Sequence, residues 1–303
     1  MTPLSQKILD QYQIRKTNKQ KKAFIELLQN QYPDLQVQES KFLKCRNLVL
    51  GDPESAEVIL TAHYDTCAQL PVPNFITPKA PLLTILYGIL LALPLMPLVI
   101  LVEVALILAL DNSLIAGWIA ITLYLGLLAL VVLGPANKHT ANDNTSGVIT
   151  LCELIDRLTD EQKRKVAFVF FDHEETGLIG SSLFRKKYKE HIKDKLLINF
   201  DCVSDGDYFL LAATKKARQT YGEQFAKAFV STESKTVMLD SLEKVYYPSD
   251  HAGYPVALAA AALKKNKVFG YYMDRIHTSK DTIFDETNID TLCSCVQRFL
   301  ELI

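Results

Sequence analysis

The chain has 303 residues, which is enough for one large α/β domain or two small ones. Its 33 Lys and Arg residues nearly balance its 34 Asp and Glu residues, so the formal net charge of −1 gives no indication of a nucleic-acid partner. The six cysteines form no CxxC pair, which disfavours a structural zinc knuckle. Several cysteines lie in apolar runs, and we expect all of them to be reduced, as in a reducing compartment.

The N-terminal part of the chain predicts one helix followed by short strands. Residues 4–31 place apolar side chains at helical spacing, with Lys and Gln on the other face. Short strands are predicted at 35–38 and 47–50. Residues 56–62 are continuously apolar or β-branched, which predicts a strand buried on both faces of a sheet. This strand leads directly into His63-Tyr64-Asp65.

Two apolar segments then interrupt the globular pattern. Residues 81–110 contain Glu103 as their only charge, and residues 114–133 contain none. Each segment provides the roughly 20 mostly apolar residues that a membrane-spanning helix needs. The polar turn at 111–113 is too short to hold a domain. We therefore expect an inserted two-helix transmembrane hairpin over residues 81–133, which contacts a lipid bilayer and returns to the side from which it started.

The charges around this hairpin predict its orientation. Lys79 and Lys138 flank it, whereas its turn carries no positive charge, so the positive-inside rule places the catalytic domain in the cytoplasm, anchored to the membrane. Pro94 and Pro97 are expected to kink the first helix or to split it into an interfacial and a spanning piece. The alternative is a helical pair buried in the core or in a dimer interface.

Strands and helices alternate again after Gly134. The alternation predicts an α/β domain, made of residues 1–80 and 134–303, with a mixed, largely parallel central sheet and helices on both faces. The predicted strands are 165–171, 195–202, 208–213 and 256–263, and the predicted helices are 145–158, 177–189, 215–230 and 288–300.

Acids and histidines lie just past predicted strand ends or in loops, where open α/β sheets bind their ligands. Zinc is bound by imidazole nitrogens and carboxylate oxygens, and two ions about 3.5–4 Å apart need a bridging carboxylate between them. Such a site requires a bridging Asp, two further carboxylates, two histidines and a separate carboxylate as general base. The segments that offer these groups are His63-Tyr64-Asp65, Asn142-Asp143-Asn144, His173-Glu174-Glu175, Asn199-Phe200-Asp201 and Ile276-His277-Thr278.

Six stretches of the chain resemble the co-catalytic zinc aminopeptidases and carboxypeptidases of metallopeptidase family twenty-eight. They occur in the family's order and extend from about residue 40 to the end, apart from the hairpin insertion. The combination of the N-D-N-x-S-G and E-E-x-G-L-x-G-S patterns is the most specific part. The resemblance implies a zinc exopeptidase fold, two Zn²⁺ ions and a peptide substrate. The stretches are TAHYDT, ANDNTSGV, FVFFDHEETGLIGS, INFDCV, YYPSDHAGY and RIHTSKDT.

The resemblance also assigns the metal ligands residue by residue. It implies that His63 and Asp201 hold one zinc, that Glu175 and His277 hold the other, and that Asp143 bridges the two. The implied activity is that of an aminopeptidase, in which carboxylates near the metals recognise the free N-terminus of a peptide. Other divalent metals could substitute for zinc.

Two further roles follow from the same resemblance. Glu174 is the implied general base, which takes a proton from the metal-activated water. Asp65, two residues after His63, would orient the imidazole of that ligand. In the family the peptide bond after the bridging Asp is often cis, which here is Asp143–Asn144.

Residues 246–251 resemble a family loop near the substrate pocket. Tyr246 and Tyr247 are candidates to assist the tetrahedral oxyanion, with packing in a loop as the alternative interpretation. Asp250 and His251 are candidate substrate-binding residues, and no metal-ligand role is assigned to His251. The remaining histidines are interpreted as structural or solvated, namely His139, His173 and His191.

The insertion is the main departure from the family pattern, because 80 positions separate His63 from Asp143. We therefore expect the mouth of the active site to lie near the bilayer and to act on membrane-proximal peptides. Two other functions compete with the aminopeptidase reading: glutaminyl-peptide cyclisation, which uses one zinc, and a catalytically inactive membrane scaffold or receptor. The complete ligand set argues against both. Oligomeric state and side-chain preference do not follow from the sequence.

Overall fold

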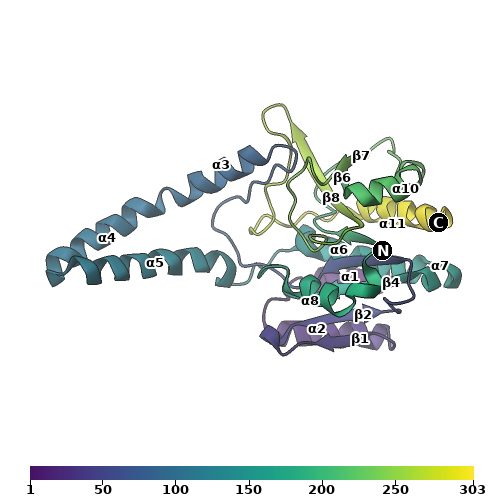
Figure 1. Cartoon of the computed structure of the whole chain (residues 1–303), viewed down its shortest axis with the longest axis horizontal. Coiled ribbons are helices and arrows are strands. Elements are labelled where there is room, and N and C mark those ends of the chain that lie inside the picture. The colour runs from purple at the N-terminus through teal and green to yellow at the C-terminus, as the bar shows by residue number, and fades with distance from the viewer.

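The computed structural model describes residues 1–303 as an α/β body from which a long helical hairpin projects (Figure 1). The body is built on one nine-stranded sheet of order β1-β2-β4-β3-β5-β8-β6-β7, with β9 paired to β8. The four central strands β4, β3, β5 and β8 are parallel, as are β6 and β7, whereas β1 and β2 extend the sheet in antiparallel fashion. The strands are β1 (Gln36–Glu39), β2 (Arg46–Leu50), β3 (Val58–His63), β4 (Val166–Phe171), β5 (Leu196–Phe200), β6 (Tyr208–Ala213), β7 (Thr236–Ser241), β8 (Ala257–Asn266) and β9 (Gly270–Tyr272).

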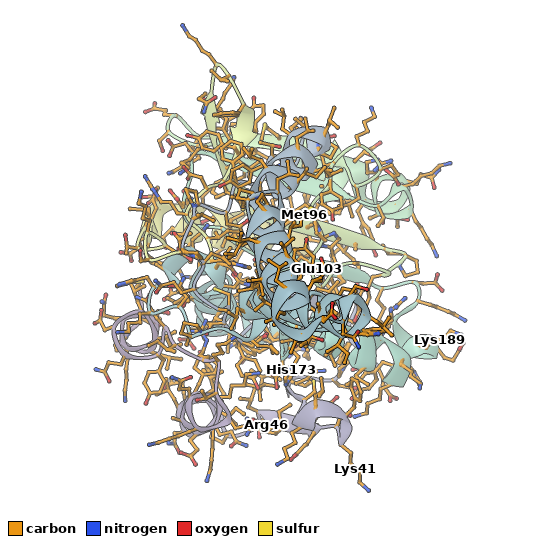
Figure 2. The ribbon with its side chains drawn as sticks, turned by 90° about the vertical axis from the view of Figure 1, so that its left-hand side faces the viewer. Lys41, Arg46, Met96, Glu103, His173 and Lys189 are labelled. Carbon is orange, nitrogen blue, oxygen red and sulfur yellow. The ribbon has the colours of Figure 1, made fainter.

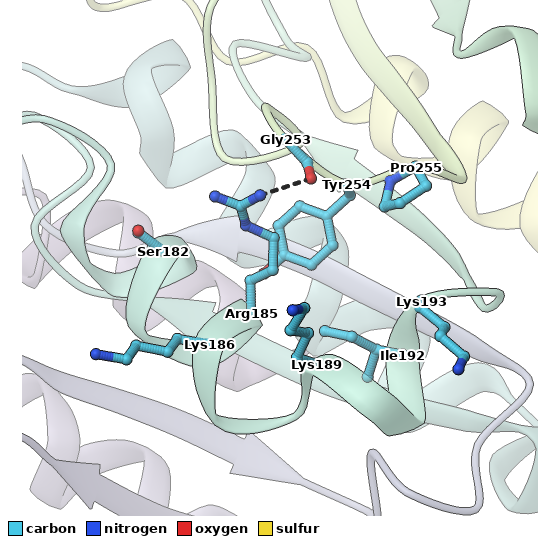
Figure 3. A pocket seen from close by; sticks show the side chains of 9 residues that line it. All are labelled: Ser182, Arg185, Lys186, Lys189, Ile192, Lys193, Gly253, Tyr254 and Pro255. Atoms are coloured by element: carbon cyan, nitrogen blue, oxygen red, sulfur yellow. Dashed lines mark hydrogen bonds between the residues drawn. The ribbon is translucent and has the colours of Figure 1, made fainter.

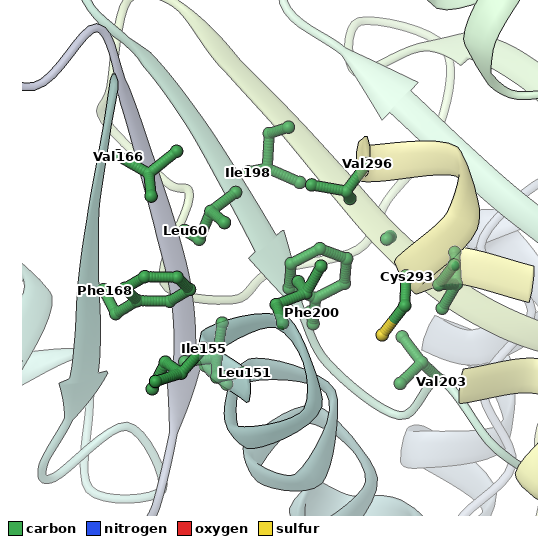
Figure 4. Close-up of a cluster of buried hydrophobic side chains, with 14 of the residues drawn as sticks. Leu60, Leu151, Ile155, Val166, Phe168, Ile198, Phe200, Val203, Cys293 and Val296 are labelled. Carbon is green, nitrogen blue, oxygen red and sulfur yellow. The ribbon is translucent and has the colours of Figure 1, made fainter. Parts of the chain in front are cut away.

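Helices cover both faces of the sheet, as the sequence predicts. Alternate residues of the central strands point to opposite faces, because the side-chain period of a strand is two. On one face Leu60, Phe168 and Ile198 pack against α6 and α11 (Figure 4). On the other face Ile59 and Val169 pack against α8 and α9. The helices of the body are α1 (Pro3–Gln11), α2 (Asn18–Gln31), α6 (Gly147–Arg157), α7 (Asp160–Lys165), α8 (Ile179–Lys187), α9 (Lys189–Ile192), α10 (Lys215–Ala228) and α11 (Glu286–Glu301).

The prediction of a single helix over 4–31 is wrong, because the structure divides this region into α1 and α2. Thr17 caps the start of α2 in a capping box with Gln20, which gives the second helix its own beginning. The loop between the helices places Arg15 in the interior, where its side chain is completely buried. The apolar periodicity continues through this loop, so the pattern alone did not reveal the break.

Two strands escaped the sequence analysis for physical reasons. The outermost strand β7 lies at the edge of the sheet and mixes exposed and half-buried residues, so it lacks a clear alternating pattern. Strand β9 has only three residues. The predicted helix over 177–189 is also shorter than expected, because a turn precedes it and a second short helix, α9, follows it.

The hairpin consists of α3 (Pro81–Ala92), α4 (Leu95–Leu110) and α5 (Ser113–Leu133). Its first arm breaks between α3 and α4 beside Pro94, as the prolines predict. Both arms are long and apolar enough to cross a membrane. At 1.5 Å per residue the 21 residues of α5 extend about 31 Å, the thickness of a bilayer's hydrocarbon core. The hairpin is not part of this chain's core, and most of its leucines are exposed.

The base of the hairpin lies at the carboxyl edge of the parallel strands. The chain leaves β3 at His63 and returns near Ala136, which forms a β-bridge with Ala68. Figure 2 views this face along the hairpin, and His173, from the loop after β4, appears on it below the helices. The hairpin therefore emerges beside the loops that carry the candidate ligands.

Candidate active site

The parallel strands bring three candidate segments to one place. His63 is the last residue of β3, and it is paired in register with Phe171, the last residue of β4. Because β5 runs parallel on the other side of β3, Asp201 also leaves the sheet at this edge. Glu174 follows β4 by three residues in the adjoining loop.

Asp143 lies between the two histidines and presents one carboxylate oxygen to each. Its Oδ1 is 3.4 Å from Nε2 of His63, and its Oδ2 is 2.9 Å from Nε2 of His277. Nε2 of His63 is also 3.5 Å from Oδ1 of Asp201, and Nε2 of His277 is 3.3 Å from Oε2 of Glu175. Two groups of donors thus share one carboxylate, which is the arrangement of a bridged two-metal site.

The donor set fits two divalent ions. His63, Asp143 and Asp201 place one donor atom each within 4.8 Å of one another. Cys67, Glu175 and His277 form a second such group, and His63, Glu174 and Glu175 form a third. Oε1 of Glu175 is buried and has no hydrogen-bond partner. A buried carboxylate oxygen without a donor is costly unless a cation binds it. Imidazole and carboxylate ligands suit zinc.

The backbone around Asp143 is held from several directions. The Asp143–Asn144 peptide bond is cis, as the family resemblance implies. The backbone N–H groups of Asn142 and Asp143 donate to the two carboxylate oxygens of Asp281, at 2.8 and 3.0 Å. The side chain of Asn144 donates to the carbonyl of Phe200 at 2.9 Å and accepts from the backbone of Gly147 at 3.0 Å. These bonds fix the Asp143 segment relative to the end of β5.

The carboxylate of Asp65 contacts the backbone of Glu174 and Glu175. Its Oδ1 accepts from the backbone N–H of Glu174 at 3.0 Å, and its Oδ2 accepts from that of Glu175 at 3.2 Å. Nδ1 of His63 lies 3.1 Å from the backbone carbonyl of Asp65 but 3.7 Å from its carboxylate. The residue therefore orients the imidazole through its main chain and positions the glutamates through its side chain.

The site contains several buried acids, and burial raises the pKa values of both glutamates. Burial raises the pKa of Glu174 well above its ordinary value, and the neighbouring Glu175 adds to the shift. Burial likewise raises the pKa of Glu175 to about 8. Burial opposes the charged form of His277, but the nearby carboxylates of Glu175 and Asp143 outweigh it and raise its pKa to about 9. Such a cluster favours the binding of cations.

Three positioning residues were missed by the sequence analysis. Asp281 holds the Asp143 segment, and its position four residues after His277 in the same loop was the available signal. Ser249 donates to Oδ2 of Asp201 at 2.6 Å. Arg15 donates from Nε to the carbonyl of Tyr64 at 2.5 Å and from Nη1 to Oγ1 of Thr145 at 3.1 Å. It thereby links the segments that carry the candidate ligands His63 and Asp143, and no local sequence pattern marked it.

The candidate substrate residues occupy different environments. Tyr247 is buried and donates from its hydroxyl to the carbonyl of Asp201 at 3.0 Å, so this hydroxyl serves the site's framework. Tyr246 is half exposed. Asp250 is fully buried with neither carboxylate oxygen hydrogen-bonded, and burial raises its pKa to about 7. His251 is buried beside Tyr247, and burial lowers its pKa to about 4.

The other three histidines lie outside the donor groups. His173 contacts Thr176, with 2.8 Å between Nδ1 and Oγ1, and His191 is exposed near Glu54. His139 precedes the Asp143 segment without entering a donor group. A surface hollow of about 390 Å³ lies apart from the site, between α8, α9 and the loop at Gly253 (Figure 3). Its lining is basic and contains none of the candidate ligands.

Comparison with known proteins identifies the family. The sequence model described as peptidase family M28 matches residues 128–303, more than half of the chain. The chain belongs to peptidase family M28. The M28 match begins within α5 and covers four of the five candidate ligands, all except His63.

Individual relatives of this M28 chain agree with the assignment. A probable leucine aminopeptidase of Arthroderma otae is 30% identical over 157 residues, which are 47% of this chain and 42% of that protein. The chain thus spans less than half of this curated relative. A Zn-dependent exopeptidase from Parabacteroides distasonis has a similar structure, with a TM-score of 0.58 and 13% identity over 98% of this chain and 96% of that one. A glutaminyl cyclase from Porphyromonas gingivalis is also similar in structure, with a TM-score of 0.56 and 16% sequence identity. The match covers 99% of this chain and 96% of that one. These structural likenesses establish the zinc exopeptidase fold.

Proposed function

We propose that this M28 protein is a two-zinc aminopeptidase. The observation that carries the proposal is the position of Asp143, whose two oxygens face His63 and His277 separately. A second acid accompanies each histidine, Asp201 on one side and Glu175 on the other. Family membership and the zinc exopeptidase neighbour support zinc, and the shared carboxylate supports two ions.

The chain's own groups define how peptide hydrolysis proceeds. Zinc bound by these ligands would supply a water of lowered pKa and polarise the scissile carbonyl. Glu174 lies near His63 and Glu175, is assigned to no metal, and takes the proton as the water attacks. It then delivers that proton to the leaving amine. Asp65 holds the main chain of Glu174 in place during both transfers.

Desolvation adapts Glu174 to this task. A general base works best when its pKa lies near the operating pH, and burial moves the pKa of Glu174 upward from the ordinary carboxyl range. The same carboxylate, next to the buried acids Glu175 and Asp250, makes the region attractive to the ammonium group of a free peptide N-terminus. This attraction favours an exopeptidase that removes residues from the N-terminus.

Glutaminyl-peptide cyclisation is the second candidate, supported by the fold of the Porphyromonas gingivalis enzyme. That reaction needs one zinc and adds no water. The chain retains donors for a second ion in Glu175 and His277, with Glu175 Oε1 lacking any other partner. This second donor group favours hydrolysis over cyclisation.

We further propose that the hairpin anchors the enzyme in a membrane. If the 21 residues of α5 span the bilayer, an equal length of the first arm, counted back from its end at Leu110, is residues 90–110. The beginning of α3 then lies at the membrane surface. Tyr87 lies there, 5.7 Å between ring centroids from Phe75, which in turn packs against Phe269 and Tyr272. Aromatic side chains favour this interfacial level.

The anchoring would face the active site toward the bilayer. The hairpin emerges at the carboxyl edge of the parallel strands, where the ligands lie, and the view along the hairpin contains His173 from the ligand loop (Figure 2). Peptides whose N-termini lie close to the membrane surface are therefore the expected substrates. The flanking residues Lys79 and Lys138 favour a cytoplasmic catalytic domain.

The activity is tested with a matched set of peptides. We expect the purified full chain with zinc to hydrolyse a leucyl amide with a free amino group and to leave its N-acetyl counterpart intact. A peptide beginning with glutamine should lose this residue by addition of water. Loss of ammonia with retention of the residue would instead establish cyclisation, and no reaction with either peptide would contradict the enzyme proposal.

The membrane proposal is tested with the single tryptophan of the chain. Trp118 lies in α5 and is 64% exposed in the absence of lipid. In nanodiscs of acyl-brominated phosphatidylcholine we expect strong quenching of Trp118 fluorescence and little effect of acrylamide. Strong quenching by acrylamide with no effect of bromine would place the hairpin outside the bilayer. A dimer whose hairpins cover one another in lipid-free solution would give neither effect.

A further inference from the structure

Cys67 lies in the loop after β3, and this loop is fastened to the second donor group. The carbonyl of Cys67 accepts from the backbone N–H of Asn137 at 3.1 Å. Three residues later the backbone N–H of Leu70 donates to the carbonyl of His277 at 2.7 Å. Cys67 is thereby held beside His277, and its side chain is only 2% exposed.

The thiol lies among metal donors. Sγ of Cys67, a carboxylate oxygen of Glu175 and an imidazole nitrogen of His277 all lie within 4.8 Å of one another. Oδ2 of Asp143 is 2.9 Å from Nε2 of the same histidine. Independently, Oε1 of Glu175 lacks any partner although the side chain of this residue is only 8% exposed. One sulfur, one nitrogen and one carboxylate therefore surround one position, and the carboxylate of Asp143 contacts the same imidazole.

The other cysteines provide a contrast. Cys152, Cys293 and Cys295 belong to the main hydrophobic core, where a thiol acts as a small apolar side chain. Cys202 packs in another apolar cluster, and its Sγ lies 3.1 Å from Oδ1 of Asp201 without joining a donor group. Cys45 and Cys67 belong to no apolar cluster, but Cys45 joins no donor group, whereas Cys67 lies beside Glu175 and His277.

We propose that Cys67 is a thiolate ligand of the metal ion held by Glu175 and His277. The inference rests on the proposed two-metal site and adds a sulfur donor to it. On binding, the S–H bond breaks, the sulfur keeps the electron pair that it gives to the metal, and the proton leaves to solvent. Together with Asp143, these donors would give the metal four protein ligands, the number found in structural zinc sites.

This assignment makes the two metal positions unequal. The position of His63, Asp143 and Asp201 has three protein donors and an open place for water, which is the pattern of a catalytic zinc. The Cys67 position would be closed, like a structural zinc. A thiolate also selects zinc, cobalt and cadmium over magnesium and manganese. The second position should therefore discriminate among metals more strongly than the first.

The test uses cobalt(II) as the probe, because thiolate coordination produces an intense near-ultraviolet charge-transfer band that oxygen and nitrogen ligands lack. The full chain in detergent is stripped with a chelator and titrated with two equivalents of cobalt. The wild type should show the band, Cys67→Ser should lose it, and Cys202→Ser should keep it as the matched control. Competition with a chelator should reveal an affinity for the second ion at least about tenfold lower in Cys67→Ser.

Zinc X-ray absorption of the wild type provides a measurement that does not depend on a variant. A sulfur scatterer near 2.3 Å is expected in addition to nitrogen and oxygen at about 2.0–2.1 Å. Two bound ions with no sulfur signal, or a band that survives in Cys67→Ser, would overturn the Cys67 assignment and leave the two-metal proposal intact. Failure of the wild type to bind two ions would overturn both.

Discussion

Replacing Asp65 by Asn tests how the site holds Glu174, the proposed general base. The carboxylate accepts one hydrogen bond from the backbone of Glu174 and one from that of Glu175, at 3.0 and 3.2 Å. An Asn side chain has nearly the same shape but only one oxygen. Its amide NH₂ group would face one of the two N–H donors, so one bond would become a donor–donor contact. The loop should then shift and move the carboxylate of Glu174.

The expected magnitude follows from the bonds that change. A hydrogen bond to a charged group contributes about 1.5–3 kcal/mol, and Asp65→Asn removes one such bond and the charge from the other. A loss of about 2–4 kcal/mol from the transition state corresponds to a decrease in kcat/KM of roughly 30-fold to 1,000-fold. Most of the decrease should be in kcat, because the proton transfer proposed for Glu174 belongs to the chemical step.

The assay measures kcat and KM with a fluorogenic leucyl amide, together with the zinc content of each sample. Asp52→Asn is the matched control, since Asp52 accepts a similar backbone hydrogen bond from Glu54 at 2.9 Å in an exposed loop. This control should keep wild-type kinetics. If Asp65→Asn retained its zinc and its kcat within about threefold, the positioning role of this carboxylate would be refuted.

Three further substitutions have defined outcomes. Gly147→Ala would place a Cβ 2.3 Å from a backbone oxygen at the end of β5, so denaturant titration should show a loss of about 2 kcal/mol or more, whereas Gly222→Ala, with nothing within 4 Å, should be neutral or slightly stabilising. Arg15→Met should release zinc more readily in chelator competition, because the buried cation ties two ligand loops together; unchanged zinc retention would contradict this. Burial lowers the pKa of His251 from its ordinary value of 6.5 to about 4. Between these two pH values the imidazole is protonated in the unfolded chain but neutral in the folded chain, which favours unfolding. Stability should fall across that window by on the order of 3 kcal/mol, and His251→Asn should flatten this decline in acid-unfolding curves, while the exposed His191→Asn should not.

The structure brings the candidate metal ligands together, and the sequence indicated this because most of them lie in short motifs just after recognisable strands. His63 closes a continuous apolar strand, and Glu174 and Glu175 follow another, so the rule for open α/β sheets was enough to place them at one edge. The role of the Asp65 carboxylate could not be foreseen. Its partners are more than 100 residues away in the chain, and nothing local to the acid indicates them.

Long-range contacts explain the other omissions in the same way. Asp281 caps the backbone of a segment that lies 138 residues earlier, and Arg15 reaches Thr145 across 130 residues. Both side chains become visible only when the fold brings the segments together. The hairpin, in contrast, was accessible from composition, since its uniform apolarity is a property of the segment itself.

The most direct test of the central claim combines metal analysis and turnover in Glu174→Gln. The account predicts two zinc ions per chain in both the wild type and the variant, because the five proposed ligands do not include Glu174, although it lies near His63 and Glu175. It also predicts a decrease in kcat of at least about 10²-fold to 10⁴-fold for a free aminoacyl amide, as expected for loss of a general base. Two zinc ions with near-normal turnover in Glu174→Gln would contradict the assigned base. A wild type that binds fewer than two zinc ions even with excess zinc would contradict the bridged site itself.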